Sequence, residues 1–359
     1  MVTLLSRPQV WTFILLSVAS ALLLVTCHLK PSISPTSTPT VPTVMAPPWT
    51  PPPLCADGET QWWHIFVYDV ATGTDAQLTQ GQVHDTSPTF SPNGEKIAFV
   101  RNGSTVQVLD LSTGIVGLIA KQEGQLSELK WSPDGERFVF VSDWTGTRQI
   151  YTMNADGTDI RRLTQRSAAE FSPYWLPDSK QVAFISTSSW LSRTSSVYTA
   201  TVTGKPSVSE ILNRWCEDID PNHPCESFLS MAWSPDGETI AVVTQSHGWG
   251  FVPPPEGRPL MIKEHECVGV VVLGQDSPML VAKTVVGGFK SLSWSPDGSQ
   301  LLYYSGCICG FEDIRIVDIA TREERKLIEV LEETGHVMAD PAWSPDGKAI
   351  VYSRASCAP

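Results

Sequence analysis

Short runs of apolar residues alternate with polar turns along the chain from about residue 60 onward. One phrase marks these turns: an aromatic residue, then Ser-Pro-Asp-Gly or a close variant, then an apolar run such as residues 96–100. Runs of this length bounded by Pro, Asp and Gly are typical of β-strands joined by tight turns. The phrase occurs six times, starting at Phe90, Trp131, Trp175, Trp233, Trp294 and Trp343. Repetition at intervals of 41 to 61 residues predicts a ring or stack of similar units.

The copy at Trp131 illustrates the predicted unit. Residues 126–131 form a first strand, and 137–142 a second after the Ser-Pro-Asp-Gly turn. Residues 149–153 and 161–165 form the third and fourth strands. A single sheet of this kind cannot hide both of its faces, whereas a radial ring of sheets can. The sequence therefore predicts an all-β fold, a six-bladed β-propeller of four-stranded antiparallel blades, in which each aromatic residue is a wedge between neighbouring blades.

The last unit supplies only two strands after Asp340, so its other two must come from elsewhere. Residues 64–70 match a third strand, and residues 76–79 match a fourth. The N-terminal strands are therefore expected to complete the C-terminal blade. Such closure removes the exposed edge of an open sheet.

The Trp-Ser-Pro-Asp-Gly copies and the segment at 150–164, Ile-Tyr-Thr-Met-Asn-Ala-Asp-Gly-Thr-Asp-Ile-Arg-Arg-Leu-Thr, resemble TolB-type propeller repeats over about residues 60–355. The resemblance implies a six-bladed propeller. TolB proper carries an α/β domain before its propeller, for which we expect no counterpart here. Similar blades precede the hydrolase domain of prolyl-oligopeptidase-like peptidases, but no Gly-x-Ser-x-Gly occurs in the chain.

The first residues are typical of a targeting segment. Arg7 is the only charged residue before an apolar run at 10–25, which suits a signal peptide and is short for a membrane span. The segment ending at Cys27 resembles a bacterial lipobox, although Thr26 departs from its usual small residue. We expect residues 1–26 to be a signal peptide or membrane anchor, with lipidation of Cys27, an uncleaved anchor or plain secretion as alternatives. Each alternative places the folded part outside the cytoplasm, in the periplasm or at the cell surface.

Residues 27–56 are rich in Pro, Ser and Thr and are expected to be an extended tether before the propeller at residues 57–359. The formal charge is −13, and no basic run occurs anywhere. Nucleic acid is therefore excluded as a partner, because binding its phosphates requires clustered Lys and Arg. The chain is expected to be monomeric, and no cofactor or catalytic residue is predicted.

Insertions interrupt the repeat on one rim. Segments 186–196, 203–228, 245–266, 305–312 and 331–339 lengthen the second–third loops and the blade-to-blade crossovers. Long loops on one side of a regular scaffold are where binding is expected. The predicted contacts with a protein or peptide ligand are the large side chains of these loops, Trp190, His247, Trp249 and Phe251.

Eight cysteines are present, and disulfides are the default outside the cytoplasm. Cys55 and Cys357 flank the strands that must meet in the closing blade, so we predict that they pair. Cys216 and Cys225 share one crossover and are predicted to pair as well. Cys267, Cys307 and Cys309 remain, and with His265 they offer a zinc or copper site as an alternative to a disulfide or a free thiol.

Three functions follow as hypotheses. The first is a non-catalytic, membrane-tethered protein- or peptide-binding module. The alternatives are an exported lyase or glycan-acting hydrolase with a site in the central channel, and a metal-binding sensor. Residues 154–159 faintly resemble a calcium-binding loop, but a hairpin turn explains the pattern with fewer assumptions.

Overall fold

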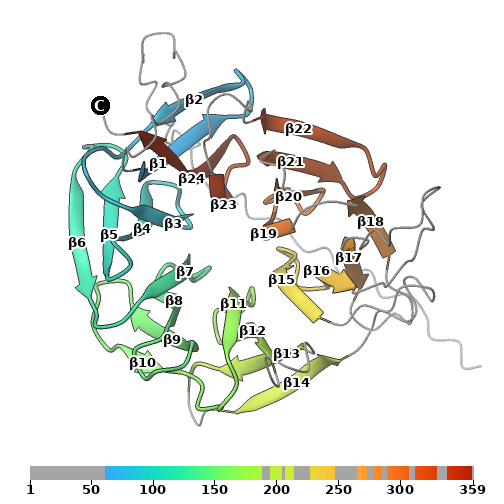
Figure 1. The fold of residues 1–359 in the computed structure, drawn as a ribbon, viewed down its shortest axis with the longest axis horizontal. Helices are drawn as coiled ribbons and strands as arrows, with labels where there is room; N and C mark the ends of the chain where they lie inside the picture. The colour runs from blue at the N-terminus through green and yellow to red at the C-terminus, as the bar shows by residue number, and fades with distance from the viewer. Residues whose placement is uncertain are drawn as a thin grey trace, which may run out of the picture. The chain divides into compact units, whose positions relative to one another are not determined.

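The computed structural model describes residues 61–187, 195–203, 207–213, 227–246, 265–272, 279–284, 289–306, 312–329 and 338–357. All of them belong to one compact unit, residues 39–359. Every regular element in the described ranges is a β-strand, and the strands form six four-stranded sheets around a central axis (Figure 1). The neighbouring strands pair antiparallel, as in a propeller whose sheets are blades.

Each blade runs from an innermost strand at the axis to an outermost strand at the periphery. Blade 1 consists of β3 (Asp85–Phe90), β4 (Lys96–Arg101), β5 (Thr105–Asp110) and β6 (Val116–Lys121). Blade 2 consists of β7 (Leu126–Trp131), β8 (Arg137–Ser142), β9 (Gln149–Asn154) and β10 (Arg161–Arg162). Blade 3 consists of β11 (Glu170–Trp175), β12 (Gln181–Thr187), β13 (Ser195–Thr201) and β14 (Val208–Asn213).

The remaining blades follow the same plan. Blade 4 consists of β15 (Ser227–Trp233), β16 (Thr239–Ser246), β17 (His265–Val272) and β18 (Met279–Thr284). Blade 5 consists of β19 (Phe289–Trp294), β20 (Gln300–Gly306), β21 (Glu312–Asp318) and β22 (Glu324–Glu329). Blade 6 consists of β23 (Met338–Trp343), β24 (Ala349–Cys357), β1 (Gln61–Asp69) and β2 (Thr74–Gln77).

The predicted unit at Trp131 agrees with blade 2 except at its outer edge. The first two strands have the predicted bounds, but β10 contains only Arg161 and Arg162 where residues 161–165 were expected. The Thr164 hydroxyl accepts the N–H of Ile150 at 3.2 Å, in place of a backbone carbonyl. A side chain therefore ends the regular ladder early.

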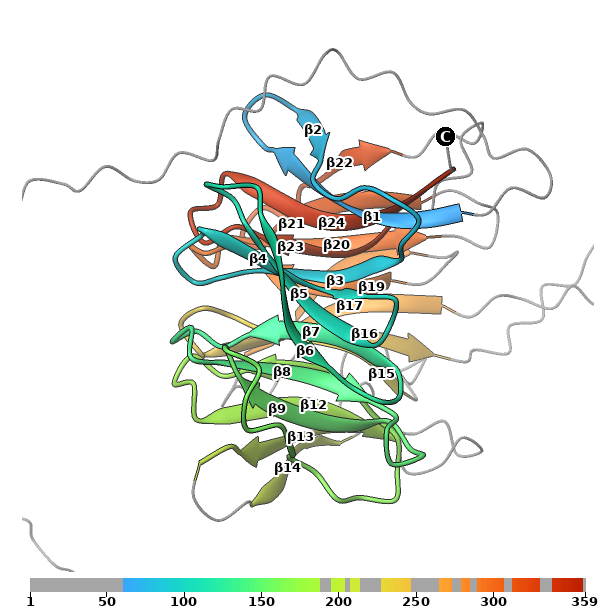
Figure 2. The same cartoon turned by 90° about the vertical axis from the view of Figure 1, so that its left-hand side faces the viewer.

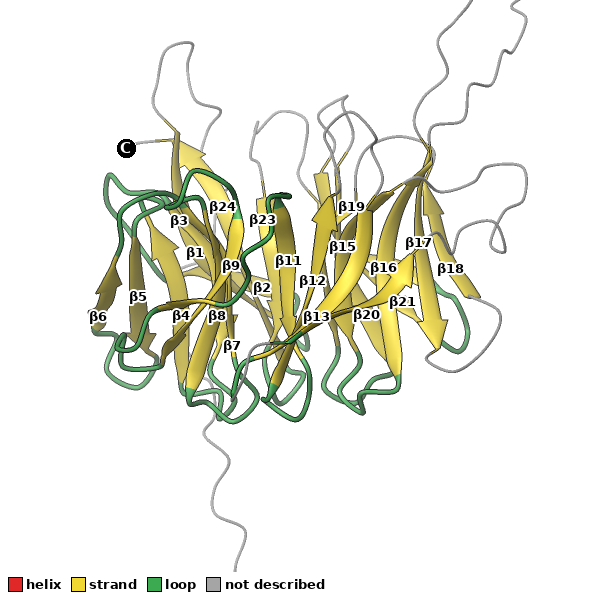
Figure 3. Cartoon of the chain, turned by 90° about the horizontal axis from the view of Figure 1, so that it is seen from below, coloured by secondary structure: helices red, strands yellow, loops and turns green. Residues whose placement is uncertain are grey.

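The Ser-Pro-Asp-Gly turns are held by their own side chains. In blade 2, the Ser132 hydroxyl donates to Asp134 Oδ1 at 2.6 Å and accepts the Arg137 N–H at 2.9 Å. Gly135 has φ of 76°, a left-handed conformation that glycine adopts without penalty. These turns lie along one rim of the ring, at the bottom of the view in Figure 3.

The wedge role of the six aromatics is confirmed, because each packs in a cluster shared by two neighbouring blades. Trp175 lies among Val139 and Val141 of blade 2 and Val182 and Phe184 of its own blade. The same arrangement recurs at Phe90, Trp131, Trp233, Trp294 and Trp343. The core is therefore divided among the blade interfaces.

The ring closes as predicted, with an N-terminal strand completing the C-terminal blade. β1 lies between β2 and β24, and nine residue pairs join it to β24, from Gln61 opposite Cys357 to Asp69 opposite Ala349. Figure 2 shows β1 and β24 side by side, next to blade 1. Closure therefore depends on segments at opposite ends of the described chain.

Candidate functional site in the central channel

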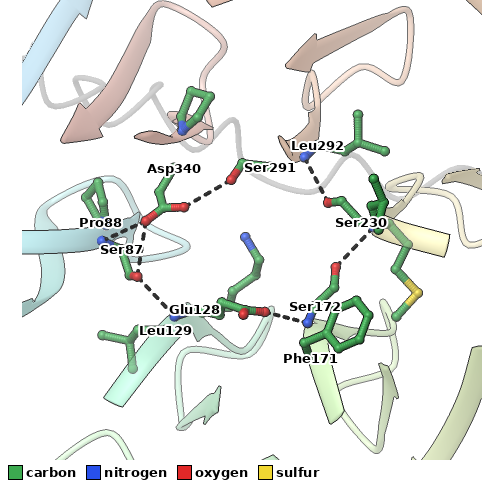
Figure 4. Close-up of a pocket in the computed structure, with 14 residues that line it drawn as sticks. Ser87, Pro88, Glu128, Leu129, Phe171, Ser172, Ser230, Ser291, Leu292 and Asp340 are labelled. Atoms are coloured by element: carbon green, nitrogen blue, oxygen red, sulfur yellow. Dashed lines mark hydrogen bonds between the residues drawn. The ribbon is translucent and has the colours of Figure 1, made fainter. Parts of the chain in front are cut away.

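One polar position recurs three residues before each wedge aromatic and faces the axis of the ring (Figure 4). In each innermost strand the pairing register shifts at or next to this position. At five of the six positions φ lies between 52° and 56°, which is uncommon for residues other than glycine. The residues are Ser87, Glu128, Ser172, Ser230, Ser291 and Asp340, and we call them the channel belt.

Hydrogen bonds link each belt side chain to the next blade. The Ser87 hydroxyl accepts the Glu128 N–H at 3.0 Å, and the Glu128 carboxylate accepts the Ser172 N–H. The Ser172 hydroxyl in turn accepts the Met231 N–H at 3.0 Å. Blades 1 to 4 are therefore joined at the axis by polar contacts as well as by their wedges.

The belt continues through blades 5 and 6 and returns to blade 1. The Ser230 hydroxyl accepts the Leu292 N–H at 3.4 Å, and the Ser291 hydroxyl donates to Asp340 Oδ1 at 3.0 Å. Asp340 Oδ2 then accepts both the N–H and the hydroxyl of Ser87, each at 3.2 Å. All six belt hydroxyls and carboxylates thus take part in one closed ring of hydrogen bonds.

The belt surrounds a cavity of about 200 Å³. Lys130 lines it one residue before its wedge aromatic, and the ammonium lies 6.0 Å from the centroid of the Tyr174 ring. Among the residues that the structure describes, this ammonium makes no hydrogen bond or ion pair. Arg148 in the β8–β9 loop donates to the other carboxylate oxygen of Glu128. Among the described residues that line the cavity, Lys130 therefore supplies a cation whose hydrogen-bond donors are unused.

Burial favours the neutral forms of two titratable groups that line the channel, Lys130 and Glu128. Burial lowers the pKa of Lys130, while the charges of Asp340 and Glu128 act in the opposite direction. Burial raises the pKa of Glu128, against the effects of Arg148 and of the Ser172 N–H. Burial also raises the pKa of Tyr174 to about 12. In each case the group is shifted because burial disfavours its charged form.

The cavity wall contains no histidine or cysteine among its lining residues. Its four serine hydroxyls are engaged in the belt, two of them as donors to the Asp340 carboxylate. In the described ranges, no group of three His, Cys, Asp or Glu side chains is placed to hold a metal ion.

The predicted contact residues Trp190, His247, Trp249 and Phe251 lie outside the described residues, as do Cys27, Cys55, Cys216 and Cys225. The strand β24 ends at Cys357, whose Cα lies opposite that of Gln61. Residues 154–159 form a hairpin turn in which Asp156 Oδ1 accepts the N–H and hydroxyl of Thr158. Among the described residues there is no helix long and apolar enough to cross a membrane.

Sequence reasoning did not select the belt or Lys130. A signal was present, because aligning the six copies on their aromatics places Ser, Glu, Ser, Ser, Ser and Asp in one column. A polar column within otherwise buried innermost strands indicates side chains that face a shared axis.

A closed ring of four-stranded antiparallel blades around a polar channel defines a β-propeller. The model of the TolB beta propeller domain matches residues 56–251, more than half of the chain. The chain belongs to this family.

The curated relatives that match the chain include a peptidase and a TolB homolog. Dipeptidyl-peptidase 5 of Porphyromonas gingivalis is 23% identical over 64% of the chain, and a TolB homolog of Chlorobium luteolum is 32% identical over 32% of the chain. The chain covers only 37% and 26% of the lengths of these relatives. A solved structure assigned as TolB, from Agrobacterium tumefaciens, superposes with a TM-score of 0.62 at 15% identity. The superposition covers 83% of the present chain and 100% of the Agrobacterium chain, and this likeness shows a shared fold.

Proposed function

We propose that this protein is a non-catalytic module that binds a protein or peptide. The observation that carries the proposal is the contrast within the channel. The belt side chains are committed to contacts between blades, whereas the Lys130 ammonium lines the cavity with its donors unused. An ammonium in this setting can hold a peptide carbonyl or a carboxylate without any chemical step.

The long loops provide the second half of the proposed binding surface. Trp190, His247, Trp249 and Phe251 supply the large side chains that anchor protein interfaces. We place the module outside the cytoplasm, tethered to a membrane through the segment that contains Cys27. The apolar run at 10–25 and the Pro-rich tether support this location.

Crosslinking in the native cell, followed by purification and mass spectrometry, tests the proposal. The wild type is compared with Lys130→Met, with a Trp249→Ala and Phe251→Ala double variant, and with Lys348→Met. Lys348 is an exposed control that lies in a Ser-Pro-Asp-Gly turn and pairs with Asp346 at 3.4 Å. We expect the first two variants to lose a partner that the control retains.

An unchanged partner list in both variants would contradict the proposed binding surface. Turnover of an oligosaccharide by the purified protein would favour the exported enzyme instead. Zinc or copper in protein purified without a tag would favour the metal-binding sensor.

A further inference from the structure

Only two of the six innermost strands begin with a buried carboxylate at the position five residues before the wedge aromatic. These are Asp85 in blade 1 and Glu170 in blade 3, and both are fully buried. The equivalent residues in the other blades are Leu126, Phe228, Phe289 and Met338. A buried carboxylate is costly unless it is paired or neutralised, so the two sites can be compared directly.

The site in blade 1 neutralises its carboxylate with a fixed charge. Arg101, whose Cα lies opposite that of Asp85, donates to both carboxylate oxygens at 2.8 Å. His64 of β1 is buried beside this pair, and burial lowers its pKa. Asp85 therefore has a bidentate partner that stays charged at any ordinary pH.

The site in blade 3 has no such partner on the opposite strand. The residue opposite Glu170 is Ser186, where blade 1 has Arg101. Glu170 Oε2 accepts the Thr164 hydroxyl, but Glu170 Oε1 has no hydrogen bond. The Ser186 hydroxyl and Gln149 Oε1 also lack partners, although both side chains are at least 97% buried.

Hydrogen bonds to the backbone bring Gln149 and Glu170 together between blades 2 and 3. The Glu170 N–H donates to the carbonyl of Arg148, the residue before Gln149, at 3.0 Å. The Gln149 amide donates to the carbonyls of Arg166 and Ala168, just before Glu170, at 2.6 and 3.3 Å. Gln149 and Glu170 are therefore neighbours, and each has a buried side-chain oxygen without a hydrogen bond.

Arg166 does not take the place of Arg101. Its Nε lies 3.9 Å from Glu170 Oε1, beyond hydrogen-bonding distance, and its guanidinium is stacked 4.0 Å from the centroid of the Tyr198 ring. Its side chain is 38% exposed, so solvent screens its charge. Glu170 Oε1 is left without a hydrogen bond.

We propose that Glu170 is held as a neutral carboxylic acid, whose proton is donated to Gln149 Oε1, and that the interface between blades 2 and 3 is a joint that loosens when Glu170 ionises. A proton on Oε1 turns one of these two acceptors into a donor. Without it, both oxygens remain buried and unsatisfied, which is costly.

The pKa of Glu170 also favours a protonated side chain. Burial raises its pKa to about 7, against the lowering effects of the Thr164 hydroxyl, the Ile150 N–H, Arg166 and Arg162. Because the folded pKa lies above the unfolded one, the folded state retains a proton that the unfolded chain has lost. The stabilisation is complete below about pH 4.5 and is lost as the pH rises through about 7.

The joint adjoins the channel belt directly. Ser172, two residues after Glu170, donates its N–H to Glu128, and Arg148 donates to the same carboxylate. Ionisation of Glu170 would disturb both neighbours of Glu128. The proposed joint therefore couples pH to the geometry of the channel.

The test compares the unfolding free energy of wild type and Glu170→Gln in urea between pH 5 and 8. Gln has the same shape and cannot ionise, so we expect the wild type to lose stability relative to the variant as the pH rises toward about 7, and the difference to level off above about pH 7. Asp85→Asn is the matched control and should leave this pH-dependent loss in place. Hydrogen exchange of a peptide covering 168–176, measured in both proteins at each pH, should show lower protection in the wild type above about pH 7, where Glu170 ionises in the folded state.

The reverse substitution adds an independent arm. Glu170→Asp combined with Ser186→Arg recreates the pair of blade 1 and should abolish the pH-dependent difference. A constant difference between wild type and Glu170→Gln from pH 5 to 8 would overturn the proposal. So would a stabilisation by NaCl or CaCl₂ at pH 8 that Glu170→Gln abolishes without any pH-dependent difference, because a cation would then occupy the place of the proton.

Discussion

The carboxylate of Asp340 in blade 6 accepts hydrogen bonds from both the N–H and the hydroxyl of Ser87 in blade 1. It also accepts the hydroxyl of Ser291 in blade 5. One side chain thus joins three blades at the axis, on the inner side of the seam where the ring closes. The closure of the ring, which we call the seam, thus combines the Asp340–Ser87 hydrogen bonds at the axis with the β1–β24 pairing farther out.

Replacing Asp340 with Ala should destabilise the ring by about 2–3 kcal/mol, because the Ser87 N–H loses a charged acceptor in a poorly hydrated channel. Asp340→Asn keeps one carbonyl oxygen and should cost less. Urea unfolding curves of the two variants check the order. Equal stability of Asp340→Ala and the wild type would show that the belt adds nothing to closure.

Replacing the wedge Trp175 with Ala should cost about 3–5 kcal/mol, because the indole is 3% exposed and fills the interface of blades 2 and 3. Trp144 in the β8–β9 loop is 49% exposed, so Trp144→Ala should cost less than about 1 kcal/mol. Thermal or urea unfolding distinguishes the two. Similar losses in both variants would argue against the wedge role.

Alanine substitutions at Gly237 and Gly114 can distinguish the cost of backbone strain from the cost of a steric contact. Their φ values are 76° and 70°, but a Cβ on Gly237 would lie 3.3 Å from the Pro177 ring, whereas Gly114 has open space. Gly114→Ala should cost about 1–2 kcal/mol from backbone strain alone. Gly237→Ala should cost more, because the blade 4 turn also presses on the blade 3 turn. The urea midpoints of the two variants give the comparison. Equal midpoints would show that the Pro177 ring moves aside at no cost.

The predicted disulfide between Cys55 and Cys357 should appear as one linked peptide when the protein is digested without reduction. Cys357→Ser should lower the stability by about 3–5 kcal/mol, because the bond would close a very long loop. Reduction of the wild type should have a similar effect. Two free thiols at these positions would rule out the predicted disulfide.

The sequence was enough to predict the all-β blades and the closing pairing, because turn chemistry and strand periodicity are local. Ser132, Asp134 and Gly135 define their turn with no help from other blades. The same locality explains why strand bounds agree closely in blade 2 except at β10, where Thr164 intervenes.

The channel was less accessible to prediction, because its residues meet only after the ring closes. Lys130 resembles any strand lysine in the sequence, and its unpaired state depends on the positions of Asp340 and Tyr174. The joint at Glu170 depends on Ser186 and Gln149, which lie on other strands. Trp190, His247, Trp249 and Phe251 remain predictions, since they lie outside the described residues.

The pairing of β1 with β24 also has a mechanical meaning. Any force applied through the residues that precede Gln61 enters the ring at this strand pair. The nine residue pairs of β1 and β24 would resist this force together. The Asp340–Ser87 contact would resist the part of the force that is transmitted to the axis of the ring. A protein pulled from its N-terminal side would therefore be expected to open at the seam first, while the interfaces among blades 1 to 5, which are continuous in sequence, stay closed.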